Sequence, residues 1–220
     1  SAPAFPARNV PSRRSASLFF VFKKTNASAP TEMSLYDSIL AKCEATFTDD
    51  DQLSTDAYCS ACDAVSEIYS AMFSIATVSN QLKSDLTNSV SSVRTAFLAS
   101  PGEQMNCRDM IAYEVAKDGL EKIRVNKKAG TIGWVWSKRA VEFISVFIRG
   151  IVTETAKSTG TVAKETYEQV LRQYHGYIVA NVVRVAMTAG PSRDKIYDRM
   201  GLPSDHEEAE KALTQLALAM

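Results

Sequence analysis

Residues 131–152 (TIGWVWSKRAVEFISVFIRGIV) carry two stripes of side chains at helical spacing. The polar stripe comprises Lys138, Glu142, Ser145 and Arg149, and the apolar stripe comprises Ile132, Trp136, Ala140, Phe143, Phe147 and Ile151. With Arg139 the segment holds four charges. Each charge costs about 2.5–3.5 kcal/mol near a bilayer centre, which excludes a transmembrane span. The segment is predicted to be a long amphipathic helix, with Trp136 near its N-terminal end, one side buried and one side open.

The sequence also predicts helices for the rest of the chain. Hydrophobic residues make up 45% of the 220 residues, enough for one domain with a core, and four of the seven prolines fall in the first thirty residues. No stretch alternates at the two-residue period of a strand. The first predicted helix begins at Ser34, and the last is capped by Ser204 and Glu207. Between them, helices are predicted over residues 56–74, 78–99, 103–118, 131–157 and 161–189. The prediction is an all-α fold of about eight helices.

The first 31 residues differ from the rest in composition. They contain five basic residues and no Asp or Glu, whereas the remainder has 20 basic and 25 acidic residues. The apolar patch Leu18–Phe22 is too short for the core of a signal peptide. Three interpretations stay open: a transit peptide, a disordered basic leader, or sequence upstream of a start at Met33. Residues 1–32 are therefore treated as a basic leader or transit-like segment, and residues 33–220 as the folded domain.

The net charge and the cysteines limit the function classes. A formal net charge of zero argues against nucleic-acid binding by bulk attraction. Cys59 and Cys62 have the CxxC spacing, but no βαβ pattern surrounds them and no second pair completes a zinc site. We expect no metal and no cofactor, and we interpret the cysteines as small apolar residues on helix faces. The alternative is a redox or hydrolytic helical enzyme that uses Cys59, Cys62 and His175.

Two polar residues on predicted helices suggest a binding site. Asp85 falls beside the apolar face of the helix predicted over 78–99, where a carboxylate is costly unless it is hydrogen-bonded. It could form a salt bridge to Lys138 or Arg139, or it could accept donors from a polar ligand. His175 stands at the edge of another apolar stripe, and the glycine after it leaves room for a ligand to approach.

Four short elements of the sequence form a recognisable series. In chain order they are residues 85–89 (DLTNS), 135–139 (VWSKR), 143–147 (FISVF) and 174–179 (YHGYIV), and the last begins about 35 residues after the VWSKR element. In order and spacing these elements resemble those of the glycolipid transfer protein family. The resemblance extends over most of the chain after the leader. The Trp-x-Lys-Arg and Tyr-His-Gly elements are fairly specific together, although either alone would be weak.

The resemblance implies a two-layer, all-α sandwich that holds one sphingolipid, with a sugar at the surface and the chains in a hydrophobic tunnel. By position, Trp136 would stack on the first sugar, with Lys138 and Arg139 in the same head-group set. Asp85 would accept hydrogen bonds from a sugar hydroxyl and the ceramide amide, and His175 would hydrogen-bond the ceramide carbonyl. The tunnel would be lined by Phe143, Phe147, Val183 and Met187, and Tyr177 would contact the membrane.

The sequence also departs from the family pattern. Glycolipid-carrying members have Asn and Lys at the fourth and seventh positions after the Asp, where this chain has Ser89 and Ser92. Two sugar contacts are therefore shortened or lost. The ceramide-1-phosphate branch has an arginine where Trp136 stands. Trp136 and Glu142 argue against a phosphate head group, although two basic residues directly follow in the Trp-x-Lys-Arg element.

We therefore expect a monomeric, non-enzymatic protein that binds one glycosylceramide or related sphingolipid and transfers it between membranes. It would touch a membrane surface transiently, bind no nucleic acid, and reside in the cytoplasm unless the leader directs it to an organelle. Ceramide-1-phosphate transfer and lipid sensing stay open as alternatives. The enzyme and a helical scaffold that binds no ligand are alternatives of other classes.

Overall fold

The computed structural model describes residues 33–47, 52–187 and 190–220. The expected leader, residues 1–32, lies outside this described part, so its interpretation stays a prediction. The described residues form eleven α-helices and two 3₁₀ turns, with isolated β-bridges and no strand, which confirms the all-α prediction. The elements are α1 (Leu35–Glu44), α2 (Thr55–Ser66), α3 (Ile68–Met72), α4 (Ala76–Ala99), η2 (Pro101–Glu103), α5 (Cys107–Asp118), α6 (Leu120–Val125), α7 (Gly130–Thr153), α8 (Thr159–Val170), η3 (Arg172–Tyr174), α9 (Tyr177–Met187), α10 (Arg193–Met200) and α11 (His206–Ala219).

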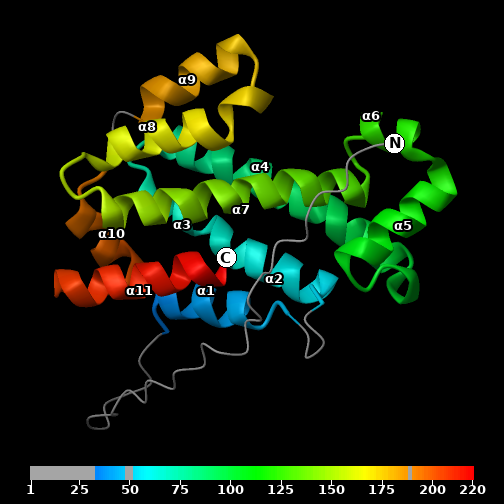
Figure 1. Cartoon of the computed structure of the whole chain (residues 1–220), viewed down its shortest axis with the longest axis horizontal. Helices are drawn as coiled ribbons and strands as arrows, with labels where there is room; N and C mark the ends of the chain where they lie inside the picture. The colour runs from blue at the N-terminus through cyan, green and yellow to red at the C-terminus, as the bar shows by residue number, and fades with distance from the viewer. Residues whose placement is uncertain (1–32, 48–51, 188–189) are drawn as a thin grey trace, which may run out of the picture. The chain divides into compact units, whose positions relative to one another are not determined.

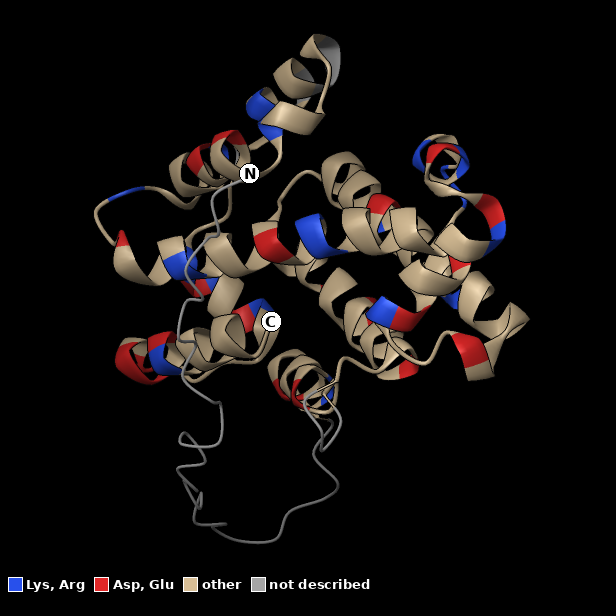
Figure 2. Cartoon of the chain, turned by 45° about the vertical axis from the view of Figure 1, so that its right-hand side comes forward, with Lys and Arg blue, Asp and Glu red and all other residues tan. Residues whose placement is uncertain are grey.

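The helices are arranged in two layers (Figure 1). One layer contains α4, α7, α8 and α9, and the other contains α1, α2 and α11, which lie below α7 in this view. The long helix α7 packs against α4 and α8 in its own layer and against α11 in the other layer. Basic and acidic residues are interspersed over the helices of both layers (Figure 2). The two-layer sandwich implied by the resemblance is confirmed.

Two predicted helices are broken in the structure. The helix expected over 56–74 is interrupted at Glu67 and becomes α2 and α3. The helix expected over 161–189 ends at α8, because the chain makes a 3₁₀ turn and then becomes extended at His175 (φ −107°, ψ 134°) before α9 begins. The chain therefore has more and shorter helices than expected, and α6 and α10 were not predicted as separate helices.

Helix capping agrees with the prediction at one end of the chain and differs by one residue at the other. The Ser34 hydroxyl accepts a hydrogen bond from the backbone N–H of Asp37 at 3.1 Å, which caps α1 as expected. α11 is capped by Asp205, which accepts from the N–H of Glu208 at 3.0 Å, rather than by Ser204. A carboxylate at this position also favours the positive end of the helix dipole.

The two stripes of α7 separate almost as predicted. Phe143, Phe147 and Ile151 are at most 1% exposed, whereas Lys138 stands on the surface. Ser145 is the exception, because it is buried and donates to the Ala217 carbonyl of α11 at 3.0 Å. Within the described part of the chain, no helix is both long and apolar enough to cross a membrane.

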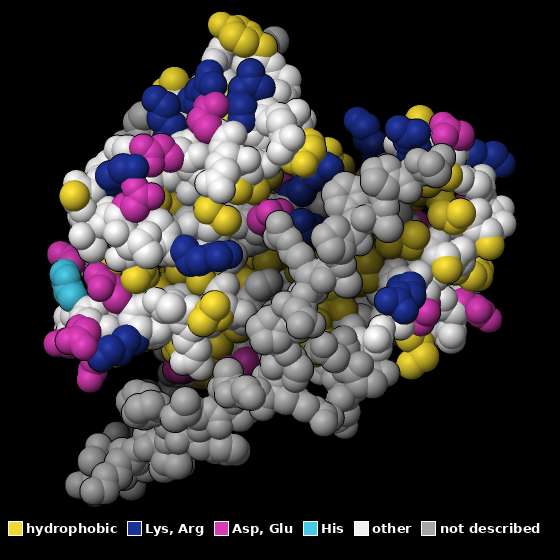
Figure 3. Space-filling view, viewed as in Figure 1, with side chains coloured by type: hydrophobic (Ala, Val, Ile, Leu, Met, Phe, Trp, Pro, Cys, Tyr) yellow, Lys and Arg dark blue, Asp and Glu magenta, His cyan; other side chains and the backbone are white. Residues whose placement is uncertain are grey.

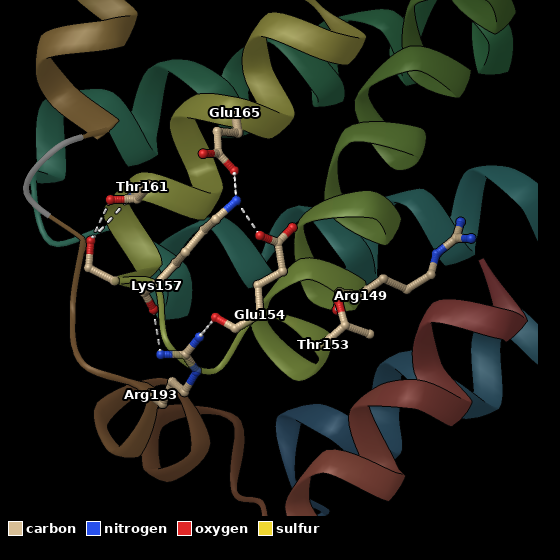
Figure 4. A network of polar contacts seen from close by, with 8 residues as sticks. Arg149, Thr153, Glu154, Lys157, Thr161, Glu165 and Arg193 are labelled. Carbon is tan, nitrogen blue, oxygen red and sulfur yellow. Dashed lines mark hydrogen bonds and ion pairs between the residues drawn. The ribbon is translucent and has the colours of Figure 1, made fainter.

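Both ends of α7 are held by charged side chains from other helices. At the N-terminus, Gly130 and Thr131 donate their backbone N–H groups to the Glu114 carboxylate of α5 at 2.7 and 2.8 Å. At the C-terminus, Arg193 of α10 donates to the Glu154 carbonyl at 2.8 Å (Figure 4). A negative group at the first end and a positive group at the second complement the helix dipole. These contacts fix the helix that carries Trp136, Lys138 and Arg139 of the predicted site.

Candidate functional site

The predicted head-group residues lie on α4, on the first half of α7 and at the chain break before α9, and the predicted tunnel and membrane-contact residues lie on the second half of α7 and on α9. α4 and α7 approach closely at Gly133, where a Cβ atom would lie only 2.5 Å from the Ser89 carbonyl oxygen. Glycine is therefore the residue that permits this contact. The contact brings the polar segment of α4 alongside the part of α7 that carries Trp136.

Trp136, Arg139 and Tyr174 form a stack. The Arg139 guanidinium carbon lies 3.5 Å from the centre of the Tyr174 ring and 4.8 Å from that of Trp136. The two rings meet edge to face, with centroids 6.1 Å apart. Trp136 is 38% exposed, in agreement with its predicted position at the boundary between core and solvent. The guanidinium is held by aromatic faces and has no carboxylate partner among the described residues, so its N–H groups are available to a ligand.

Lys138 has a different environment from its neighbour. Its ammonium group forms an exposed ion pair with Glu142 of the same helix at 3.0 Å. Of the two basic residues after Trp136, only Arg139 lies with the indole. In the described part of the chain, neither basic residue forms the salt bridge to Asp85 that the sequence left open.

Asp85 is exposed and is not turned into the core, so the expectation of a costly buried carboxylate was wrong. The side chain lies beside the apolar stripe and reaches the solvent edge of α4, where it accepts from the Gln81 amide at 2.8 Å. Its charge still acts on two neighbours. Burial raises the pKa of Tyr69 and the Asp85 charge adds to this rise, and the same charge raises the pKa of His175 against other effects.

Ser89 and Ser92 are half-buried and make local hydrogen bonds. The Ser89 hydroxyl donates to the Asp85 carbonyl at 2.8 Å, and the Ser92 hydroxyl donates to the Asn88 carbonyl at 3.3 Å. Such bonds to the preceding turn are typical of serine inside a helix. Both hydroxyl protons are therefore engaged with the backbone, so a contact to a ligand requires rotation of the side chain.

His175 is half-buried at the break before α9. Its Nδ1 atom lies 2.9 Å from the Tyr167 hydroxyl of α8, and its carbonyl accepts from Arg172 at 3.1 Å. When the tyrosine donates to Nδ1, the neutral imidazole carries its proton on Nε2 and can donate to a carbonyl oxygen. Desolvation lowers the pKa of His175 below its ordinary 6.5, and it outweighs the opposing effect of Asp85. The ring is therefore neutral near pH 7.

The expected tunnel residues belong to the apolar core. Phe143 and Phe147 are buried and stack on Phe73, with ring centroids 6.4 and 5.9 Å from it. On α9, Met187 is buried and Val183 packs partly buried against the same core. Figure 3 shows further hydrophobic side chains at the surface between the α8–α9 part and the lower helices. Apolar residues thus extend from the core to this face.

Tyr177, the expected membrane contact, is 74% exposed at the first residue of α9. Figure 1 shows this end of α9 projecting on the side of α7 opposite to α11. An aromatic residue in water at such a projecting end is suited to a bilayer interface. Its role there stays a prediction.

The profile of the family described as glycolipid transfer protein (GLTP) matches residues 53–202, which is more than half of the chain. The chain belongs to the glycolipid transfer protein family.

Relatives in this family confirm the fold. A glycolipid transfer protein from Aureobasidium melanogenum is 23% identical over 187 residues, which cover 85% of this chain and 87% of the relative. Mouse ceramide-1-phosphate transfer protein in its apo form superposes with a TM-score of 0.74 at 21% identity, covering 86% of this chain and 90% of that chain. HET-C2, a fungal glycolipid transfer protein, superposes with a TM-score of 0.67 at 19% identity, covering 86% and 87%. The fold is thus shared by proteins named for two different lipids.

The CxxC cysteines of this glycolipid transfer protein family member lie in the core. Cys59 and Cys62 of α2 are free, 1% and 2% exposed, and burial raises their thiol pKa values to about 11 and about 12. Both thiols are protonated near neutral pH and are poor nucleophiles. Across the described residues, no group of three or more His, Cys, Asp or Glu could hold a metal ion. These properties favour the structural interpretation of the cysteines over the redox alternative.

Sequence reasoning missed two tyrosines of the site. Tyr174 holds the Arg139 guanidinium and Tyr167 holds the His175 ring. Tyr167 stands eight residues before His175 in a segment that was predicted to be one continuous helix. The contact between Tyr167 and His175 forms because the helix ends after α8 and the chain turns before α9. The periodicity of the sequence does not indicate this interruption of the helix. Tyr174 could have been predicted to belong to the site, because it is an aromatic residue directly before His175.

Proposed function

We propose that this chain binds one sphingolipid, a glycosylceramide, and transfers it between membranes without chemical change to the lipid. Membership of the glycolipid transfer protein family supports lipid transfer. The observation that carries the head-group proposal is the half-exposed Trp136 indole beside the fixed Arg139 guanidinium. An enzyme would need an activated nucleophile or base, and neither the buried cysteines nor the Tyr167-bound His175 provides one.

The sugar would be bound through its two kinds of surface. Its C–H face suits the Trp136 indole, because an aromatic ring buries apolar area without needing a hydrogen bond. Its hydroxyl groups would donate to the Asp85 carboxylate, and hydrogen bonds to an ionised acceptor are the stronger ones. The exposure of Asp85 supports this role, because the carboxylate is accessible without a change in the helix. Its amide partner Gln81 would yield to a sugar hydroxyl.

The ceramide amide needs both a donor and an acceptor once it leaves water. Asp85 would accept from the amide N–H, and Nε2 of His175 would donate to the amide carbonyl. The Tyr167 hydroxyl at the Nδ1 atom supports this division, and desolvation, which lowers the pKa of His175, favours the neutral ring that it requires.

The two hydrocarbon chains would enter the apolar region bounded by Phe143, Phe147, Val183 and Met187. Burial of a chain contributes about 0.8 kcal/mol per CH₂ group, so a long chain strongly favours the bound state. The aromatic stack of Phe73, Phe143 and Phe147 fills this region in the structure, so we infer that α9 moves outward as the chains enter.

Ceramide-1-phosphate transfer is the second candidate, and one observation favours it. Among the described residues Arg139 has no carboxylate partner, its guanidinium is oriented by the Tyr174 ring, and a guanidinium is well suited to bind phosphate oxygens. The similarity to mouse ceramide-1-phosphate transfer protein agrees with either cargo, because it concerns the fold. Lipid sensing would use the same site. We further propose that the protein acts as a cytoplasmic monomer that touches membranes transiently.

Transfer of labelled galactosylceramide and labelled ceramide-1-phosphate between phosphatidylcholine vesicles tests the proposal. We expect transfer of galactosylceramide by the full chain. Trp136→Ala should lower that rate at least tenfold, since the sugar loses its stacking surface, with little change in melting temperature. Unchanged galactosylceramide transfer would overturn the role of Trp136, and transfer of ceramide-1-phosphate alone would establish the second candidate.

A matched control removes an aromatic side chain of the same exposure. Phe47 is 39% exposed, close to the 38% of Trp136, and lies on the connection between α1 and α2. Phe47→Ala should leave transfer unchanged. Equal losses in both variants would mean that general surface hydrophobicity, rather than a sugar contact, explains the effect.

A further inference from the structure

The aromatic series at the proposed tunnel includes a buried tyrosine. Tyr69 of α3 is 1% exposed, and its ring stacks on Phe73 with centroids 6.2 Å apart. Phe73 in turn stacks on Phe143 and Phe147, two of the residues that we propose to bound the lipid chains. Tyr69 therefore adds one ring to the proposed tunnel wall, and this ring carries a hydroxyl group.

The Tyr69 hydroxyl lacks the partner that other buried tyrosines have. The described residues include four buried tyrosines. The hydroxyls of Tyr58 and Tyr167 are paired, with Ser137 Oγ at 2.8 Å and with His175 Nδ1 at 2.9 Å. In the described part of the chain, the hydroxyl of Tyr69 forms no hydrogen bond. A buried hydroxyl without a hydrogen bond is destabilising, so this group calls for a partner that the described chain does not supply.

The register of α3 against α4 places Tyr69 toward the head-group end of the proposed tunnel. The Lys83 ammonium of α4 contacts the Glu67 carboxylate at 2.7 Å, so the start of α3 lies beside the turn of α4 that carries Asp85. Only a short connection joins Phe73 to the start of α4, so Phe73 lies toward that end and Tyr69 toward Asp85. In agreement with this placement, burial raises the pKa of Tyr69 and the Asp85 charge adds to the rise.

We propose that the Tyr69 hydroxyl hydrogen-bonds a chain hydroxyl close to the ceramide amide, so that the protein prefers sphingolipids with hydroxylated chains. Such a hydroxyl has two sources, a 2-hydroxy acyl chain and a 4-hydroxysphinganine base. A phenol both donates and accepts, which suits an alcohol group. A plain hydrocarbon chain displaces water from the wall and offers no partner, so only the hydroxylated lipid forms this bond. The inference rests on the proposed sphingolipid transfer and deepens it, since it names the cargo by its chains.

Competition between pairs of galactosylceramides tests the role of Tyr69. Vesicles contain equal amounts of the plain lipid and of one hydroxylated form, either the 2-hydroxy acyl or the 4-hydroxysphinganine lipid. Native mass spectrometry of the recovered full chain gives the ratio of the two bound lipids, which differ in mass. For at least one pair, the wild-type ratio should favour the hydroxylated lipid about two- to tenfold more than the ratio of Tyr69→Phe, because one hydrogen bond is lost. The preference of the vesicle itself for either lipid cancels in this comparison.

The matched control removes another unpaired tyrosine hydroxyl. Tyr197 of α10 is 4% exposed, and its buried hydroxyl has no hydrogen-bond partner among the described residues. Its ring meets the edge of His206 rather than the aromatic series. Tyr197→Phe should keep the wild-type ratio. Both variants should keep or raise the melting temperature, because each loses an unpaired buried hydroxyl.

The outcomes separate this inference from the proposed function. The pair whose ratio changes in Tyr69→Phe identifies the chain that passes Tyr69. Equal ratios for the wild type and Tyr69→Phe in both pairs would overturn the inference, while bound galactosylceramide would still support the proposed function. The same change of ratio in Tyr197→Phe would also overturn it. If the wild type binds no galactosylceramide, the proposed function fails and the inference fails with it.

Discussion

The α4–α7 contact is a close approach of two backbones, whereas the α8–α9 contact includes an exposed ion pair. α4 and α7 meet at Gly133, which lets the two backbones approach beside the buried Val93 side chain. α8 and α9 are separated by a chain break and share an exposed ion pair between Glu168 and Arg184, with Nη2 2.9 Å from Oε2. Close packing tolerates little displacement, whereas an exposed ion pair contributes little to stability.

This difference suggests how one protein can recognise a head group and still admit long chains. Asp85 and Trp136 stand on the tightly packed pair, so the proposed sugar would meet a fixed geometry. His175, Val183 and Met187 stand at or beyond the break, on the element that we infer to move. We therefore predict different effects for substitutions on the rigid pair α4 and α7 and for substitutions on the displaceable helix α9.

The largest effect is expected from filling the close contact. In Gly133→Ala the new Cβ would lie 2.5 Å from the Ser89 carbonyl oxygen and 2.9 Å from Val93, so backbone atoms must move. The free energy of unfolding should fall by about 2–3 kcal/mol, which lowers the melting temperature by about 2–4 °C per kcal/mol. Gly176→Ala is the control, because a Cβ there meets nothing within 4 Å. Equal melting temperatures for the two variants would show that α4 and α7 are not closely packed at Gly133.

A smaller effect is expected from restoring a lost contact on the rigid part. Ser89→Asn should add a hydrogen bond to the sugar, at about 0.5–1.5 kcal/mol, and raise the affinity for galactosylceramide about two- to twelvefold. Affinity for bare ceramide should hardly change. Titrations of both lipids that follow tryptophan emission measure the difference. Equal changes for the two lipids would place the head group away from α4.

A rate effect is expected on the displaceable part. Arg184→Gln removes the ion pair to Glu168, so α9 should leave α8 more readily and lipid exchange should accelerate about two- to fivefold. The melting temperature should hardly change. Lys211→Gln removes an exposed ion pair to Glu207 on α11 and serves as the control. Slower exchange in Arg184→Gln would show that the ion pair assists opening.

The smallest effect concerns pH. The folded state holds the pKa of His175 below the 6.5 of the unfolded chain, mainly through desolvation. Its contribution to stability is therefore fully present above pH 6.5 and is lost as the pH falls through the lowered pKa. Melting curves between pH 7.5 and 5 should show a decline that is shallower in His175→Asn. Identical profiles would mean that the imidazole is not desolvated at the break.

The sequence by itself determined the local features of this protein. Helical periodicity predicted the long helix, the separation of its stripes and the half-exposed position of Trp136, because these depend on spacing within one element. The burial of Cys59 and Cys62 agrees with their interpretation as small apolar residues on helix faces. The motifs over α4, α7 and α9 were sufficient to indicate the family, which the match over residues 53–202 confirmed.

Only the tertiary structure decided the contacts between elements. The stack of Arg139 on Tyr174 joins residues 35 positions apart, and the bond between Tyr167 and His175 exists because the predicted helix breaks between them. Asp85 is exposed, and α7 makes its closest approach to α4 one turn further along, at Ser89. Side-chain spacing reports which face of a helix is apolar. It does not report which other helix covers that face, since that depends on packing across the whole domain.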